Sequence, residues 1–102
     1  MLRFNYHIQS AVIRETLRLG NGFGGKLPRT VPAEGLHISS ANITIPPGTR
    51  IAMSPYLTHS DPRIYPEPHK FIPERWLGEE GKELDKYLLS FSKGSRICAG
   101  MQ

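Results

Sequence analysis

The sequence predicts an α+β chain with one amphipathic helix, a small β unit, and a proline-rich meander that leads into a loop around the only cysteine. Helical periodicity of apolar residues is confined to one segment near the start. Short β-branched runs then alternate with proline and glycine turns. Nine prolines and ten glycines in 102 residues leave little room for further long elements.

The helix is predicted over residues 6–19, with the sequence YHIQSAVIRETLRL. Ile8, Val12, Ile13 and Leu17 recur at the spacing of one apolar helix face, so the helix is expected to be amphipathic. The Gly-Asn-Gly sequence that follows ends the helix.

A β region is predicted over residues 28–54. Residues 36–38 and 42–45 are expected to be short strands, and residues 50–54 the strand that returns after the PPGT sequence. Proline followed by glycine predicts a type II turn there, because Gly48 accepts the positive φ that this turn requires.

The meander covers residues 64–77, where three prolines and three aromatic residues rule out a long helix or a central strand. Asp61 followed by Pro62 predicts a single helical turn before it. Residues 79–89 favour a short helix, and residues 91–100 a glycine-containing loop.

Composition excludes several classes of function. The net charge of +4 is mild and no nucleic-acid-binding motif occurs, so we expect no nucleic-acid partner. One cysteine excludes an intramolecular disulfide and a multi-cysteine zinc site, and no apolar run is long enough for a membrane span. The histidines are not spaced for a metal site, so solvated or capping roles are expected for His7, His37, His59 and His69.

The cysteine lies in FSKGSRICAG, residues 91–100. Glycines on both sides allow the backbone to turn tightly and to approach a flat cofactor, and Arg96 supplies a positive charge beside Cys98. The alternative is a small buried thiol without a chemical role.

Two other patterns are ordinary when taken singly. Glu15 and Arg18 have the i, i+3 spacing of an exposed helical ion pair. Arg75 precedes Trp76 in the sequence PERW, which is compatible with a stacked surface arginine.

Taken in order, these patterns resemble one family, the cytochrome P-450 haem-thiolate monooxygenases. The family signature F-x-x-G-x-R-x-C-x-G is matched at every fixed position, by Phe91, Gly94, Arg96, Cys98 and Gly100. Its E-x-x-R and P-E-R-W elements are matched upstream, and the resemblance extends from about residue 6 to residue 102, most closely to fungal members.

The resemblance implies a part of the mainly-α cytochrome P-450 fold and a set of residue roles. Cys98 would be the axial ligand of haem iron, and Arg96 and Arg29 would each contact a haem propionate. Glu15, Arg18 and Arg75 would form a buried three-member ion network, since buried charge is tolerated only when it is paired.

The same resemblance implies surroundings for these residues. Phe91 would pack near the thiolate, and residues 22–29 would approach the substrate pocket. The reaction would be monooxygenation of a small organic substrate by haem (iron protoporphyrin IX), with electrons from an NADPH-dependent reductase. Lys86 and Lys93 are candidates for docking an acidic reductase surface. A complete fungal relative would lie on the endoplasmic reticulum membrane.

The chain lacks the family's oxygen-activating sequence [AG]-G-x-[DE]-T, so no catalytic residue is assigned in it. We expect it to be a piece of such an enzyme, inactive and weak in haem binding alone, with its ion network more exposed than in a complete protein. The alternative is a non-catalytic remnant or interaction module. A cysteine-nucleophile enzyme using Cys98 with His69 has no support from spacing.

Overall fold

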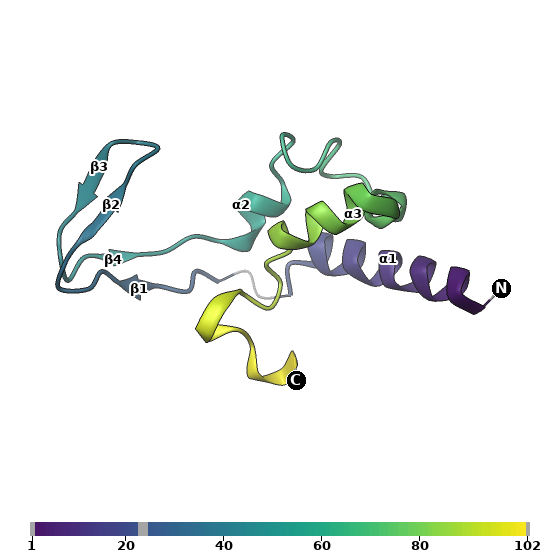
Figure 1. Ribbon diagram of the computed structural model, residues 1–102, viewed down its shortest axis with the longest axis horizontal. Helices are drawn as coiled ribbons and strands as arrows, with labels where there is room; N and C mark the ends of the chain where they lie inside the picture. Colours follow the sequence, from purple (N-terminus) through teal and green to yellow (C-terminus); the bar gives the residue numbers. More distant parts are fainter. Residues whose placement is uncertain (1, 23–24, 102) are drawn as a thin grey trace. The chain divides into compact units, whose positions relative to one another are not determined.

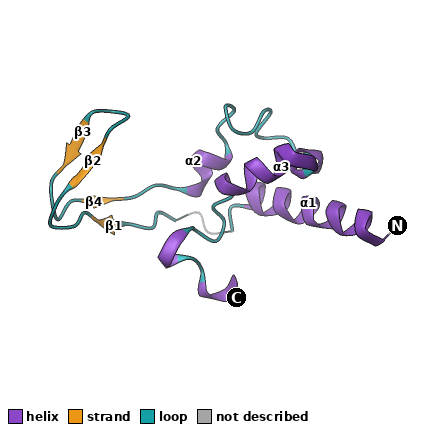
Figure 2. Cartoon of the chain, viewed as in Figure 1, coloured by secondary structure: helices purple, strands orange, loops and turns teal. Residues whose placement is uncertain are grey.

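The computed structural model describes residues 2–22 and 25–101, and the chain divides into two compact units (Figure 1). The first unit comprises Met1–Gly24 and Pro55–Gln102, and the second comprises Gly25–Ser54. In the described part of the chain, the helices belong to the first unit and the strands to the second (Figure 2). None of the described helices is both long enough and apolar enough to cross a membrane.

The first unit is built on the long helix α1 (Leu2–Gly20), to which α2 (Pro55–His59), α3 (Gly78–Leu84) and four short 3-10 helices are added. The 3-10 helices are η1 (Pro73–Trp76), η2 (Asp85–Tyr87), η3 (Gly94–Arg96) and η4 (Ala99–Met101). Helix α1 starts earlier than predicted, because residues 2–5 contain neither proline nor glycine to stop it. The short helix predicted over residues 79–89 is confirmed by α3 and η2.

The apolar face of α1 is not the face that this chain buries. Ile8, Val12 and Ile13 are 42%, 39% and 58% exposed. The buried positions are instead Ala11, Glu15 and Arg18, a stripe at i, i+4 and i+7. The apolar residues do lie on one face of α1. In this chain, however, the polar groups of the meander cover the opposite face of the helix.

The core of the first unit is small. Ala11 of α1 packs with Tyr65 and Trp76 of the meander, and partly buried apolar side chains surround them: Ile64, Leu84 and Leu88. Helix α3 approaches η1 so closely that a Cβ added at Gly81 would lie 2.2 Å from the backbone of Trp76. Only glycine fits this contact, so the position of Trp76 depends on Gly81.

The second unit contains two antiparallel pairs. Strand β2 (Leu36–Ile38) pairs with β3 (Ile43–Ile45), and β1 (Arg29–Thr30) pairs with β4 (Arg50–Ile51). The turn before β4 has Gly48 at φ +79° and a hydrogen bond from Thr49 N–H to the Pro46 carbonyl, at 3.4 Å, as predicted for type II.

The returning strand predicted over residues 50–54 is shorter in the structure, where β4 comprises Arg50–Ile51 and pairs with β1. A type II turn splays the strands on either side of it, which accounts for the failure of β3 and β4 to form a hairpin. Val31, next to β1, is the buried apolar residue of this unit.

Candidate functional site

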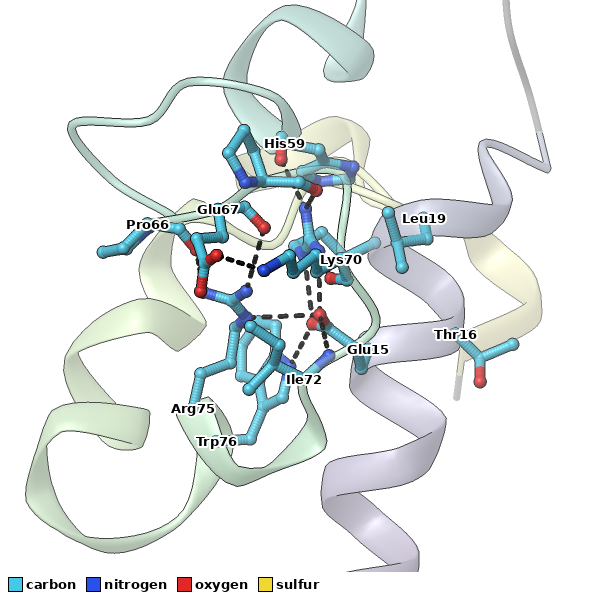
Figure 3. A network of polar contacts seen from close by, with 12 residues as sticks. Glu15, Thr16, Leu19, His59, Pro66, Glu67, Lys70, Ile72, Arg75 and Trp76 are labelled. Atoms are coloured by element: carbon cyan, nitrogen blue, oxygen red, sulfur yellow. Dashed lines mark hydrogen bonds and ion pairs between the residues drawn. The ribbon is translucent and has the colours of Figure 1, made fainter.

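Glu15 is the centre of a buried polar cluster in the first unit (Figure 3). Its side chain has no exposed surface, and its two carboxylate oxygens accept five hydrogen bonds. Oε1 accepts from Arg18 Nη2 at 2.8 Å, Ile72 N–H at 3.0 Å and Arg75 Nε at 3.2 Å. Oε2 accepts from Arg18 Nε at 2.9 Å and Trp76 Nε1 at 2.8 Å.

Arg18 is equally well satisfied. A guanidinium group has five N–H donors, and all five are used here. Two of them donate in parallel to the two carboxylate oxygens of Glu15, which is the bidentate geometry that makes such ion pairs strong. The other three reach backbone carbonyls: His59 and Pro68 at 2.7 Å, and Lys70 at 3.2 Å. The group also lies over the Tyr65 ring, 5.0 Å from its centroid.

Arg75 completes the cluster from the meander. Its side chain is 7% exposed and donates to Glu15, to the Pro66 carbonyl at 2.9 Å and to the Glu67 carbonyl at 3.5 Å. One carboxylate and two guanidinium groups leave a net charge of +1, which the ring of backbone carbonyls offsets. A proline-rich segment makes few regular backbone hydrogen bonds, so its carbonyls are free to accept from the arginines.

The cluster strongly favours the ionised carboxylate. Burial opposes ionisation of Glu15, but the hydrogen bonds from Arg18, Ile72 and Trp76 and the charge of Arg18 outweigh it. The result is a pKa of Glu15 lowered to about 2. Burial has the opposite outcome for the neighbouring phenol, where it raises the pKa of Tyr65 to about 12.

The structure thus brings Glu15, Arg18 and Arg75 into one buried cluster. The network is expected to be more exposed in this chain than in a complete protein, and that comparison stays a prediction; in this chain, α1 and the meander already bury all three side chains. Trp76 was missed as a member. Its signal was available, because a buried indole N–H needs an acceptor and Arg75 precedes it in the motif.

His59 was also interpreted wrongly. It is 2% exposed, not solvated, and its backbone carbonyl belongs to the cluster. Its ring Nε2 accepts the backbone N–H of Leu89 at 2.9 Å. No sequence spacing indicated this contact, because the two residues are thirty positions apart and lie on different elements.

The cysteine loop, residues 91–100, has a defined backbone. Cys98 N–H donates to the Phe91 carbonyl at 2.8 Å, and Ile97 N–H donates to the Gly94 carbonyl at 3.1 Å. Ser92 and Gly94 have φ of +65° and +78°, in the left-handed region that glycine adopts without strain. The thiol of Cys98 is free and exposed, and a Cβ added at Gly100 would lie 3.8 Å from its sulfur.

Of the other predicted site residues, Phe91 and Arg96 belong to this loop and Arg29 belongs to the second unit. Arg96 is exposed and forms no ion pair with any described residue, whereas Phe91 is half-buried and lines a groove with Ile13 and Leu17 of α1. Arg29 belongs to the second unit, where it is exposed and donates to the Pro28 carbonyl at 3.1 Å. The predicted pocket segment, residues 22–29, lies partly outside the described residues.

The two lysines near the loop differ in availability. Lys86 is paired with Glu83 at 2.9 Å, whereas the Lys93 ammonium donates to the Asp85 carbonyl at 3.1 Å. No group of three or more His, Cys, Asp or Glu side chains in the described part of the chain could hold a metal ion. Cys98 is therefore a single soft donor on an exposed loop, with an unpaired arginine two positions before it.

Comparison with known proteins agrees with these features. Residues 5–102 match the family model for cytochrome P450. The chain is 50% identical over 91 residues to cytochrome P450 monooxygenase aneF of Aspergillus aculeatus, which covers 89% of the chain and 18% of that protein. It is 49% identical over 92 residues to cytochrome P450 monooxygenase asqL of Emericella nidulans, covering 90% of the chain and 19% of that protein. The same identity over 92 residues relates it to cytochrome P450 monooxygenase BOT1 of Botryotinia fuckeliana, covering 90% and 17%.

The chain thus spans about a fifth of the length of these curated relatives. The family match, in contrast, extends over nearly all of its residues, and both the buried Glu15 cluster and the cysteine loop lie within it. The chain belongs to the cytochrome P450 family, whose members are haem proteins.

Proposed function

We propose that this chain supplies the haem-thiolate segment of a cytochrome P450 monooxygenase, with Cys98 as the axial ligand of the iron. One observation carries the proposal: the exposed thiol of Cys98 lies on a loop whose backbone is closed by the Cys98 N–H bond to the Phe91 carbonyl. A ligand thiolate needs this combination of access and fixed backbone.

The residues of the loop fit haem in two further respects. Arg96 is exposed and unpaired among the described residues, so its guanidinium is available to a propionate. Gly94 has no atoms within 4 Å of where a Cβ would lie, and Gly100 leaves the thiol unobstructed on its own side. Arg29 is exposed as well, and its role as a second propionate contact stays a prediction.

In the proposed function, the role of the Glu15 cluster is structural. It ties the meander to α1 through five hydrogen bonds: Arg18 donates to the Pro68 and Lys70 carbonyls, and Glu15 accepts from Ile72, Arg75 and Trp76. Neither arginine side chain is exposed enough to meet a ligand in solvent. The segment that leads from the meander to the cysteine loop therefore starts from a rigid support.

Bound haem would activate O2, so that one oxygen atom enters an organic substrate and the other leaves as water. The electrons are proposed to come from an NADPH-dependent reductase. Lys93 is the better of the two lysine candidates for docking it, because Lys86 is already paired with Glu83. The substrate and the membrane location of a complete enzyme stay predictions.

The proposal is tested by exchanging the matched segment into a relative. Residues 5–102 replace the corresponding segment of the Aspergillus aculeatus relative, and the purified protein is reduced and exposed to CO. The expected result is the strongly red-shifted Soret band of a thiolate-ligated haem, absent after Cys98→Ser. A protein that folds and binds haem but shows no such band would contradict the proposal. The band's survival in Cys98→Ser would contradict the assignment of the ligand.

The 102-residue chain itself is titrated with haemin in parallel. We expect weak binding, because the one thiol of this chain is exposed to water on its loop. A stable thiolate spectrum in the isolated chain would contradict that expectation and would show that the loop alone makes the site. A non-catalytic interaction module predicts no thiolate spectrum in either protein.

A further inference from the structure

His59, the last residue of α2, connects the Glu15 cluster to the segment that precedes the cysteine loop. Its backbone carbonyl accepts from Arg18 Nη1 at 2.7 Å, within the Glu15 cluster (Figure 3). Its ring Nε2 accepts from the backbone N–H of Leu89 at 2.9 Å, two residues before the cysteine loop begins. The residue is 2% exposed, so both contacts are shielded from water.

The second contact defines the state of the ring. An imidazole nitrogen accepts a hydrogen bond only when it carries no proton, so the ring is neutral and its proton lies on Nδ1. Nδ1 is buried and has no hydrogen-bond partner among the described residues. Burial lowers the pKa of His59, partly opposed by the backbone of Arg18, so the neutral ring is the resident form at neutral pH.

Leu89 lies in a short segment that leads directly to the ligand loop. Leu88 packs against the core, and the Ser90 hydroxyl donates to the Leu17 carbonyl at 3.1 Å. The next residue is Phe91, whose carbonyl accepts the N–H of Cys98. The hydrogen bond from Leu89 to the His59 ring therefore links this segment to a residue whose backbone carbonyl is held by Arg18.

We propose that His59 is a positioning residue for the cysteine loop, acting as a neutral acceptor that fixes Leu89 and thereby the start of residues 91–100. Its role in haem chemistry rests on the proposed function of Cys98, whereas its role in fixing the loop does not. The sequence motifs of the family signature do not include it, and the hydrogen bonds given above join it to Arg18 and Leu89.

Acid should release this contact, because a doubly protonated ring cannot accept the Leu89 N–H. The groups that face the ring are Arg18 from α1, which disfavours a second positive charge, and Tyr65, whose ring lies edge-on at 6.4 Å. The segment Leu88–Ser90 contributes no charged or titratable side chain. With its pKa below 6.5, His59 supports the loop at neutral pH, and its contribution is lost as pH falls from about 6.5 through the lowered value.

The experiment is amide hydrogen exchange by NMR on the full 102-residue chain, with four proteins compared. His59→Phe keeps an aromatic ring but removes the acceptor, and His59→Gln retains an acceptor at a similar reach. His69→Phe is the matched control, because His69 is an exposed histidine of the same unit. Exchange is read at Leu89 and Cys98, with Ile72 reporting on the Glu15 cluster.

In His59→Phe, we expect Leu89 to exchange about 10- to 100-fold faster, the range expected for leaving one buried donor unpaired. Cys98 should change in the same direction and Ile72 much less. His59→Gln should restore most of the protection, and His69→Phe should match the wild type. In the wild type, Leu89 protection should fall as the ring nitrogens of His59 titrate.

Two results would overturn the proposal: equal Leu89 exchange in the wild type and His59→Phe, or exchange in a folded His59→Gln as fast as in His59→Phe. If His59→Phe unfolds the whole unit, the acid titration of the wild type decides. Leu89 protection that is unchanged while the ring titrates would then refute the acceptor role. None of these readouts requires haem, so they stand apart from the outcome for Cys98.

Discussion

Glu15→Gln is the substitution that probes the buried cluster most directly. The amide has nearly the shape of the carboxylate but no charge, so Arg18 and Arg75 would be left without their counter-ion. Its NH2 group would also face donors, since each carboxylate oxygen now accepts from at least two of them. Both effects destabilise the folded chain.

The magnitude can be worked in two ways that agree. Lowering the pKa of Glu15 from 4.5 to about 2 corresponds to roughly 3 kcal/mol in favour of the ionised carboxylate. Breaking a buried ion pair by removing one partner typically costs about 3–5 kcal/mol. We therefore expect Glu15→Gln to lower the free energy of unfolding by about 3–5 kcal/mol, a large part of the stability of a domain this size.

The assay is urea unfolding followed by tryptophan fluorescence. Trp76 is the only tryptophan, is 5% exposed and donates to Glu15, so its emission reports on the cluster itself. The matched control is Glu83→Gln, which removes the same charge from an exposed pair with Lys86 and should cost less than about 1 kcal/mol. A loss below about 1 kcal/mol for Glu15→Gln, with an unchanged dependence on urea, would show that the charge of Glu15 does not stabilise the cluster.

Three further predictions use the same unfolding assay. Arg75→Ala should cost about 1–3 kcal/mol, less than Glu15→Gln, because Arg18 still pairs with both carboxylate oxygens; an equal or larger loss would contradict this. Gly81→Ala should cost about 1–3 kcal/mol of stability or more, because its Cβ would overlap the backbone of η1. Gly20→Ala is the control and should be nearly neutral, because a Cβ there meets no atoms within 4 Å. Equal effects of the two substitutions would show that the close contact at Gly81 is absent. The group with the lowered pKa, Glu15, stabilises the fold above pH 4.5, so stability should fall as pH drops from 4.5 towards 2; a midpoint that does not change across that range would argue against the ionised cluster.

Much of the site could be predicted from the sequence because its signals are local or carried by motifs. Glu15 and Arg18 share a helix face by their spacing alone, and the turn at Gly48 follows from the backbone freedom of one residue. Arg75 was assigned to the same network by family resemblance, and the structure brings it to 3.2 Å from Glu15. No composition or periodicity would have joined residues sixty positions apart.

The remainder depends on which surfaces meet in three dimensions. Ile8 and Ile13 look like a core face by periodicity, but burial is decided by what covers a helix, and here the meander covers Glu15 and Arg18. His59 and Trp76 carry no spacing signal for their partners, because both partners come from distant elements. The sequence alone allows β4 to pair with β3 or with β1. The type II turn before β4 disfavours a hairpin with β3, and β4 pairs with β1.

X-ray absorption at the iron edge of the segment-exchanged relative would establish whether Cys98 is the iron ligand. We expect one sulfur scatterer in the first coordination shell, which disappears in Cys98→Ser while the rest of the haem environment remains. A coordination shell of nitrogen and oxygen alone, or a sulfur scatterer that persists after Cys98→Ser, would contradict that expectation.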